Sequence, residues 1–305
     1  MYYIHAISSI SHQDSFRSEN IFDGLQILGE KSEPIAPAYK EFIPPTSLRR
    51  LSPVLRMGLT ASIECRKTVD NDFDAISVGT ALGCLRDTEK FLTTILTTTS
   101  DFLSPTAFIQ STHNTIGGQI SLGLGNHAYN MTHTQNNLSF EVAMIDAILC
   151  VDEGKKNVLV GAADEHIPFL ELLQPDLISD KSPLTSGASF FAISSENNKS
   201  NIGVKAVYTN FNTKDVETSV REFLAQQGLE ISDLDLVLSD DETRMNIPAG
   251  VTSMNYLAYS GTHYSAPAFA VHIAHDYLAS KDAKYVLVVN EMCKGKLGLT
   301  LIQKG

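Results

Sequence analysis

The chain has 305 residues, 43% of them hydrophobic and 19% charged, which is enough apolar material for a large buried core and too little charge for a disordered chain. Its 23 Lys and Arg against 35 Asp and Glu give a formal net charge of −12. We therefore expect neither nucleic acid nor an anionic membrane surface as a partner, because both need a basic face.

Cysteine spacing and hydropathy bear on the compartment. The four cysteines are far apart and form no CxxC pair, so neither a zinc ribbon nor a redox dithiol is indicated. The first residues carry no basic start followed by a long apolar core, and no run of 18 apolar residues occurs. We expect a reduced cytoplasmic protein with no metal and no other cofactor.

The first half of the chain predicts an alternation of strands and helices. The expected elements, in order, are a strand at 2–7, a proline-rich surface connection at 31–53, a helix beginning near Ser52, a buried strand at 72–80 and a helix at 86–103. Ser104-Pro105 breaks that helix. The glycine-rich segment 117–125 would form a helix only if close packing stabilises it, because each glycine lowers helix propensity by about 1 kcal/mol.

The segment 139–150 is apolar nearly all round, which predicts a helix buried on most of its faces. Gly154 stands where a C-cap would be, and 157–162 is a fully apolar strand.

The second half repeats this plan. Its strand at 233–239 matches the strand at 72–78, its Ala-rich helix at 266–280 matches the apolar helix, and its strand at 284–291 matches 156–164. We interpret the chain as an internal duplication, with halves of about 1–195 and 196–305. Two halves rich in strands and buried helices predict a layered α/β fold.

These landmarks, in this order, resemble the β-ketoacyl synthase branch of the thiolase-like superfamily. The resemblance rests on Ser104 to Glu165, with the glycine-rich run of 114–125, the apolar helix and a strand ending in Ala-Ala-Asp-Glu, followed by the strand at 184–193. It implies one domain over 1–305, a five-layered α/β/α/β/α sandwich of two duplicated halves.

The catalytic residues of that family are carried over one by one. Its nucleophilic Cys, at the N-terminus of the central helix, aligns without gaps with His133. Its first catalytic His, after a strand, aligns with Asp240, and its second aligns with Thr262, with His263 one residue away. We therefore expect no catalytic residue here, because a histidine cannot form the acyl thioester and a carboxylate opposes the carbanion.

A ketosynthase-like chain without the nucleophile resembles a chain-length factor. The resemblance implies a heterodimer with an active ketosynthase in type II fatty-acid or polyketide-like elongation, reaching an acyl carrier protein through that partner. The short chain is similar to the type found in aryl-polyene clusters. It implies a partner surface at about Thr115 to Tyr129 and an acyl cavity lined by five residues: His133, Thr134, Gln135, Phe140 and Met144.

Two other functions stay open. The first is an enzyme of the same fold that carries out decarboxylation or acyl transfer with His133 or His263 as base. The second is a structural homodimer without acyl chemistry. An isolated homodimer is compatible with all three. Asp240-Asp241-Glu242 is interpreted as a solvated turn rather than a cation site, and the histidines lack the spacing of a metal motif.

Overall fold

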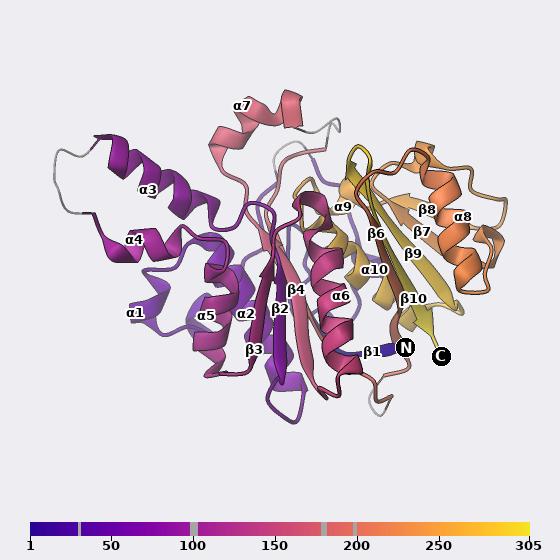
Figure 1. The fold of residues 1–305 in the computed structure, drawn as a ribbon, viewed down its shortest axis with the longest axis horizontal. Coiled ribbons are helices and arrows are strands. Elements are labelled where there is room, and N and C mark those ends of the chain that lie inside the picture. The colour runs from indigo at the N-terminus through magenta and orange to yellow at the C-terminus, as the bar shows by residue number, and fades with distance from the viewer. Residues whose placement is uncertain (30–31, 98–102, 178–181, 198–199) are drawn as a thin grey trace.

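The computed structural model describes residues 1–29, 32–97, 103–177, 182–197 and 200–305. Its strands form one ten-stranded sheet in the order β3-β2-β4-β5-β1-β6-β10-β9-β7-β8 (Figure 1). The sheet consists of two five-stranded halves joined where β1 meets β6, through the pairs Tyr2 with Val204 and Tyr3 with Gly203.

The two halves have the same strand order and the same strand directions. In the first half β2 runs parallel to β3 and β4, while β5 runs antiparallel to β4 and β1. In the second half β7 runs parallel to β8 and β9, while β10 runs antiparallel to β9 and β6. The duplication predicted from the sequence is confirmed. The strands are β1 (Tyr2–Ile10), β2 (Ala75–Gly79), β3 (Tyr129–His133), β4 (Val158–Asp164), β5 (Gly187–Ser194), β6 (Ile202–Asn210), β7 (Leu236–Ser239), β8 (Thr252–Asn255), β9 (Tyr285–Cys293) and β10 (Lys296–Lys304).

Two buried helices lie between the halves. Helix α6 (Ser139–Asp152) packs on β2 and β4 of the first half and on β6 and β10 of the second. Helix α10 (Ala266–Ser280) packs on β9 and β10 and also on β5 and β1. A helix between two sheets has to be apolar on opposite faces, which is why both sequences lack a polar side.

Helices on the outer faces complete five layers. Helices α2 (Pro53–Thr68) and α5 (Thr115–Leu124) cover the first half, and α8 (Val216–Gln226) covers the second. The thiolase-like sandwich predicted from the sequence is confirmed. No helix among the described residues is both long and apolar enough to cross a bilayer.

The glycine-rich segment is helical because it packs closely. A Cβ at Gly123 of α5 would force the Leu59 side chain of α2 to move, so glycine permits the close approach of these two helices. The predicted helix at 86–103 is α3 (Leu85–Thr97), and 98–102 lie outside the described residues. The other helical segments are α1 (Pro45–Leu48), α4 (Pro105–Gln110), α7 (Pro168–Leu177), α9 (Leu257–Ser260) and the 3-10 turns η1 (Phe22–Gly24), η2 (Tyr39–Glu41), η3 (Asn136–Leu138), η4 (Ile231–Asp233) and η5 (Glu242–Arg244).

Candidate functional site

A tight elbow connects edge strand β3 to the central helix α6. The strand ends at His133, Asn136 takes a left-handed φ of 55°, and η3 leads into the helix at Ser139. A left-handed residue, which asparagine tolerates better than most, reverses the chain within few residues. The alignment predicted His133 at the helix N-terminus, but the structure places it at the end of β3, because the intervening residues form the elbow.

Asn137 lies in η3, just before the buried N-terminus of α6. Its side chain is fully buried, and its Nδ2 donates to Asn290 Oδ1 at 3.2 Å and to the Lys296 carbonyl at 2.9 Å. Asn290 Nδ2 in turn donates to the Asn137 carbonyl at 2.7 Å. These bonds attach the N-terminus of α6 to the β9–β10 hairpin of the other half.

The first sheet half also touches the first turn of α6. A Cβ added to Gly79, the last residue of β2, would lie 2.5 Å from the Ser139 carbonyl oxygen. Real Cβ atoms do not approach an oxygen so closely, so glycine is required here. The start of the central helix is therefore enclosed by β2 on one side and by the β9–β10 hairpin on the other.

Glu141 lies in the first turn of α6 and is buried. Its Oε1 accepts from Asn290 Nδ2 at 2.8 Å, while its Oε2 has no hydrogen-bond partner among the described residues. The pKa of this carboxyl is raised to about 7, because burial and, to a smaller extent, the nearby Asp240 outweigh the lowering by the Asn290 hydrogen bond. Glu141 is a titrating group that the sequence analysis overlooked.

Asp240 follows β7, where the alignment put it, but it is buried. Its Oδ2 accepts from Arg244 at 2.7 Å, and its Oδ1 accepts from the Glu291 backbone N–H at 2.7 Å. Arg244 also binds the Glu291 carboxylate. Burial raises the pKa of Asp240 and Arg244 opposes that rise. The expectation of a solvated turn is thus wrong for Asp240, since a guanidinium makes its burial tolerable.

His263 and Thr262 lie in the loop before α10. Thr262 exchanges backbone hydrogen bonds with Pro183 and Thr185, at 2.8 and 3.0 Å. The Thr185 hydroxyl donates to the Ser260 carbonyl, so it accepts from His263 Nδ1 at 2.9 Å. Burial lowers the pKa of His263 to about 3. The imidazole is therefore neutral, and its other nitrogen faces Gly187, where a Cβ would lie 2.6 Å away.

Asp164 and Glu165, at the end of β4, hold the loop that leads into α3. Asp164 Oδ1 accepts from the Thr80 hydroxyl at 2.8 Å and from the Ala81 and Leu82 N–H groups at 3.0 Å each. Glu165 accepts from the Arg86 N–H at 3.0 Å. Burial raises their pKa values to about 6 and about 7. The pair belonged to the motif behind the resemblance, but nothing local in the sequence shows what the carboxyls bind.

Cys293, the last residue of β9, lies near the start of α6. The Asn137 backbone and the Tyr264 side chain lie close enough to this thiol to lower its pKa. Burial raises the pKa of this thiol, against these contacts and Lys296. Only the fold reveals the contact, because the two residues are far apart in the sequence.

The five residues predicted to line an acyl cavity differ in their burial. Phe140 and Met144 are fully buried in the core between the halves, whereas Thr134 and Gln135 are exposed in the elbow. His133 Nε2 lies 3.2 Å from the Asp146 carboxylate, which also accepts from the Tyr129 hydroxyl. The elbow and β3 therefore form one surface, tied to α6 through Asp146.

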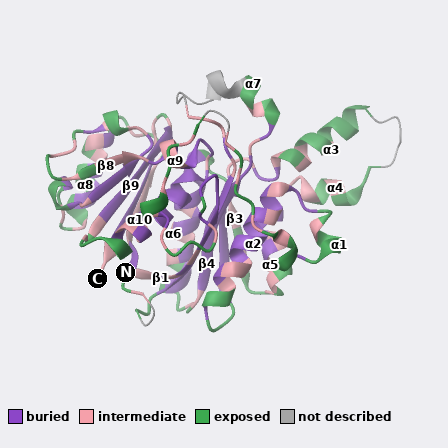
Figure 2. Ribbon diagram, turned by 180° about the vertical axis from the view of Figure 1, so that it is seen from behind, coloured by how far each residue is buried: buried purple, intermediate pink, exposed green. Residues whose placement is uncertain are grey.

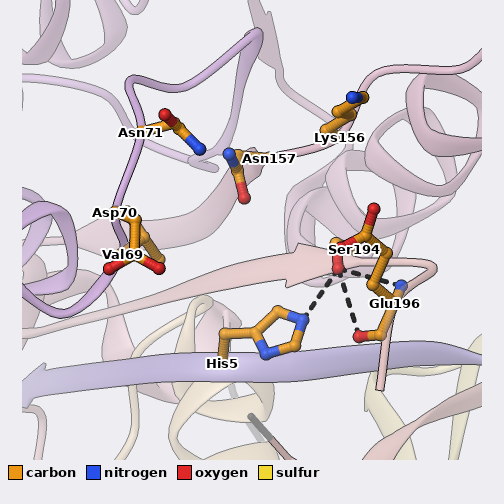
Figure 3. A pocket seen from close by; sticks show the side chains of 8 residues that line it. All are labelled: His5, Val69, Asp70, Asn71, Lys156, Asn157, Ser194 and Glu196. Carbon is orange, nitrogen blue, oxygen red and sulfur yellow. Dashed lines mark hydrogen bonds between the residues drawn. The ribbon is translucent and has the colours of Figure 1, made fainter. Parts of the chain in front are cut away.

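The cavities described here do not lie at the start of α6. One of about 20 Å³ touches Asp164, Glu165, Thr262 and His263, and another of 320 Å³ is lined by His12 and His166. A polar pocket of 180 Å³ lies at the opposite end of β4, between Asn157 and the Ser194–His5 hydrogen bond of 2.7 Å (Figure 3). No group of three metal-ligating side chains occurs among the described residues.

Fold and sequence comparisons define the class. A family described as "Beta-ketoacyl synthase, N-terminal domain" matches residues 27–233, more than half of the chain. The chain belongs to the β-ketoacyl synthase family. No curated protein sequence matches it.

Three similar structures have low sequence identity and so support the fold alone. "The ishigamide ketosynthase/chain length factor" has a TM-score of 0.82 at 15% identity, with 100% of this chain and 99% of that chain covered. A type II polyketide ketosynthase bound to its acyl-carrier protein, AntDE:AntF, has a TM-score of 0.79 at 14% identity, covering 100% and 99%. The ketosynthase ApeO with its chain length factor ApeC, from Xenorhabdus doucetiae, has a TM-score of 0.63 at 13% identity, covering 99% and 98%.

Proposed function

We propose that this chain is a non-catalytic subunit of the chain-length-factor kind, which pairs with an active ketosynthase in type II fatty-acid or polyketide-like elongation. The carrying observation is Asn137, buried and fully engaged through its amide nitrogen at the entry to the central helix. An amide side chain cannot form the thioester through which condensation passes. We assign the degenerate nucleophile position to Asn137 rather than His133.

The two positions expected to hold catalytic histidines support the same proposal. Asp240 is occupied by its ion pair with Arg244, and Thr262 carries no base. The Asp240 carboxylate accepts from Arg244, and the Thr262 hydroxyl donates to the Ser182 carbonyl at 3.4 Å, so neither side chain is directed at a developing oxyanion. Growing acyl chains would therefore react on the partner subunit.

The nature of the partner is inferred from the similar structures, whose names pair a ketosynthase with a chain length factor and, in one, with an acyl-carrier protein. We propose a cytoplasmic heterodimer of the short type found in aryl-polyene clusters. This chain would be one domain with halves 1–195 and 196–305. Its partner surface would include edge strand β3 and α5, where Tyr129, Met131 and Leu122 are exposed.

The buried Phe140 and Met144 bear on how such a subunit limits acyl length. Both side chains fill the space beside the elbow in the absence of a partner. We propose that they form the wall at which the acyl cavity of the heterodimer ends, with Thr134 and Gln135 at its partner side. Their replacement by smaller residues would then lengthen the product.

A histidine-based enzyme is the alternative that the geometry opposes. His263 has one ring nitrogen bound to Thr185 and the other packed on Gly187, and His133 is held by Asp146. His263 can accept a proton only through Nε2, which is buried and faces Gly187, and Asp146 fixes the orientation of the His133 ring. Activity of the chain alone on malonyl-carrier protein, lost in His133→Ala or His263→Ala, would reinstate this alternative.

Co-expression with the ketosynthase encoded nearest to it tests the proposal. Only this chain is tagged, and native mass spectrometry weighs the purified complex. The proposal predicts a one-to-one heterodimer. A clean homodimer that ignores the ketosynthase would favour a structural protein without acyl chemistry.

A further inference from the structure

A polar pocket lies at the edge of the sheet where β4 begins, away from the start of α6. Its volume is 180 Å³, and seven of its eight lining residues are polar, with Val69 as the exception. Figure 2 shows this lower edge of the molecule, where the buried strands end in exposed turns. Strand β4 separates the pocket from Asp164 by about 20 Å, since its residues rise about 3.3 Å each. The pocket is therefore distinct from the centre at α6.

Two walls of the pocket are held in place by hydrogen bonds within the chain. The turn after α2 is fixed by Arg66, whose guanidinium donates to Asp72 Oδ1 at 2.6 Å. The turn before β4 is fixed by Asp74, whose Oδ2 accepts from the backbone N–H groups of Lys156 at 2.8 Å and Asn157 at 3.1 Å. Both turns therefore keep their shape without a ligand, so that binding would order little of the chain.

A third wall joins β1 to the end of β5. The Ser194 hydroxyl accepts from His5 Nε2 at 2.7 Å and from the Glu196 backbone N–H at 3.1 Å, and it donates to the Glu196 carbonyl at 3.4 Å (Figure 3). Ser194 is only 3% exposed. This buried hydroxyl therefore fixes the backbone that carries Glu196 and the imidazole of His5 relative to each other.

Three polar side chains of the lining are not satisfied by the chain itself. The Lys156 ammonium and the side-chain amides of Asn71 and Asn157 have no hydrogen-bond or ion-pair partner among the residues that the structure describes. Asp70 and Glu196 add two carboxylates to the same lining. Figure 3 shows Asp70 and Lys156 on opposite sides of the pocket. The pocket thus presents both signs of charge, together with amides that can donate and accept.

The volume and the charges limit the class of ligand. A space of 180 Å³ holds roughly six water molecules at about 30 Å³ each, or a ligand of about six to nine non-hydrogen atoms. A purely anionic ligand would meet two carboxylates, and a purely cationic one would leave Lys156 unpaired. A compact zwitterion matches both signs of charge.

We propose that this pocket binds a small zwitterion of the α-amino acid kind. The ammonium group of the ligand pairs with Asp70 and Glu196, and its carboxylate pairs with Lys156. The amides of Asn71 and Asn157 bind its remaining polar atoms. The assignment does not depend on the proposed function, because none of these residues belongs to the centre at α6.

The test is an NMR titration of the full chain, labelled with nitrogen-15 at asparagine. The side-chain amide resonances of Asn71 and Asn157 report on the pocket directly. The probes are L-serine and two analogues that each lack one of its charged groups: ethanolamine lacks the carboxylate, and 3-hydroxypropionate lacks the ammonium. The proposal predicts that L-serine shifts both resonances with a Kd of about 1 mM or lower, and that each analogue binds at least about ten-fold more weakly.

A pair of neighbouring lysines supplies the variant and its matched control. Lys156→Met removes the ammonium from the pocket and should weaken L-serine binding about ten-fold. Lys155→Met should leave it unchanged, because Lys155 does not line the pocket and its ammonium lies 3.6 Å from the Glu153 carboxylate. Circular dichroism and urea unfolding verify that both variants fold.

Each other outcome overturns the proposal. If L-serine shifts neither resonance in the wild type, the pocket holds water alone. If ethanolamine binds as tightly as L-serine and Lys156→Met has no effect, the pocket is a cation site and the zwitterion is the wrong class. If Lys155→Met weakens binding as much as Lys156→Met does, the loss reflects surface charge in general. None of these results bears on whether the chain pairs with a ketosynthase.

Discussion

Replacing Glu141 by Gln isolates the cost of a buried carboxylate at the start of the central helix. The pKa of Glu141 is about 7 in the folded protein against 4.5 as the ordinary value, with burial the main cause. In the folded state Glu141 therefore stays protonated up to a higher pH than in the unfolded chain. The free energy of unfolding consequently falls as the pH rises from below 4.5 through 7. Gln keeps an oxygen to accept from Asn290 and never ionises.

The magnitude follows from the difference in pKa. A shift of about 2.5 units corresponds to about 3 kcal/mol at pH 8, where the carboxylate is ionised, and to less than about 1 kcal/mol at pH 5. Glu141→Gln is therefore expected to raise the free energy of unfolding at pH 8 by about 2 to 3 kcal/mol more than at pH 5. Urea unfolding of both proteins at both pH values measures this double difference, in which the other titrating groups cancel. An equal effect of the substitution at the two pH values would refute the reasoning.

Three further substitutions or modifications probe the site. Arg244→Met leaves the buried carboxylates of Asp240 and Glu291 without their cation and should lower the free energy of unfolding in guanidinium by about 3–5 kcal/mol. If a triple variant that also neutralises both carboxylates fails to recover stability, the ion pair is not the cause. Asp164→Ala removes the acceptor of two backbone N–H groups and one hydroxyl, so amide exchange of Ala81 and Leu82 should accelerate, and unchanged protection would contradict the anchoring role. Iodoacetamide should alkylate Cys293 at pH 7.5 more slowly than a free cysteine, because burial raises the pKa of its thiol, and mass spectrometry of the peptide would detect the opposite result.

Much of the fold could be predicted from the sequence because its patterns are local. All-round hydrophobicity identified α6 and α10, and short apolar runs identified β4 and β9 as buried strands. The duplicated order of those patterns then predicted the two sheet halves. The glycines of α5 disfavour a helix locally, and the Leu59 contact that Gly123 accommodates joins residues far apart in the chain.

The site was less predictable, because its contacts join both halves. The ungapped alignment put His133 at the helix start, whereas in the structure His133 ends β3 and the left-handed turn at Asn136 separates it from α6. The contact of Cys293 with Asn137 depends on the β9–β10 hairpin folding back on α6. A spacing pattern carries no information on such a contact.

The location of the condensing nucleophile tests the central claim most directly. The heterodimer is reconstituted with a ketosynthase whose nucleophilic cysteine is replaced by Ala, and condensation of acyl- and malonyl-carrier protein is followed by mass spectrometry. As controls, the unaltered complex and a folded Asn137→Ser complex are assayed in parallel. We expect turnover to disappear with the partner's cysteine and to persist in the Asn137→Ser complex. Turnover that survives the loss of the partner's cysteine would place the chemistry in this chain and contradict the central claim.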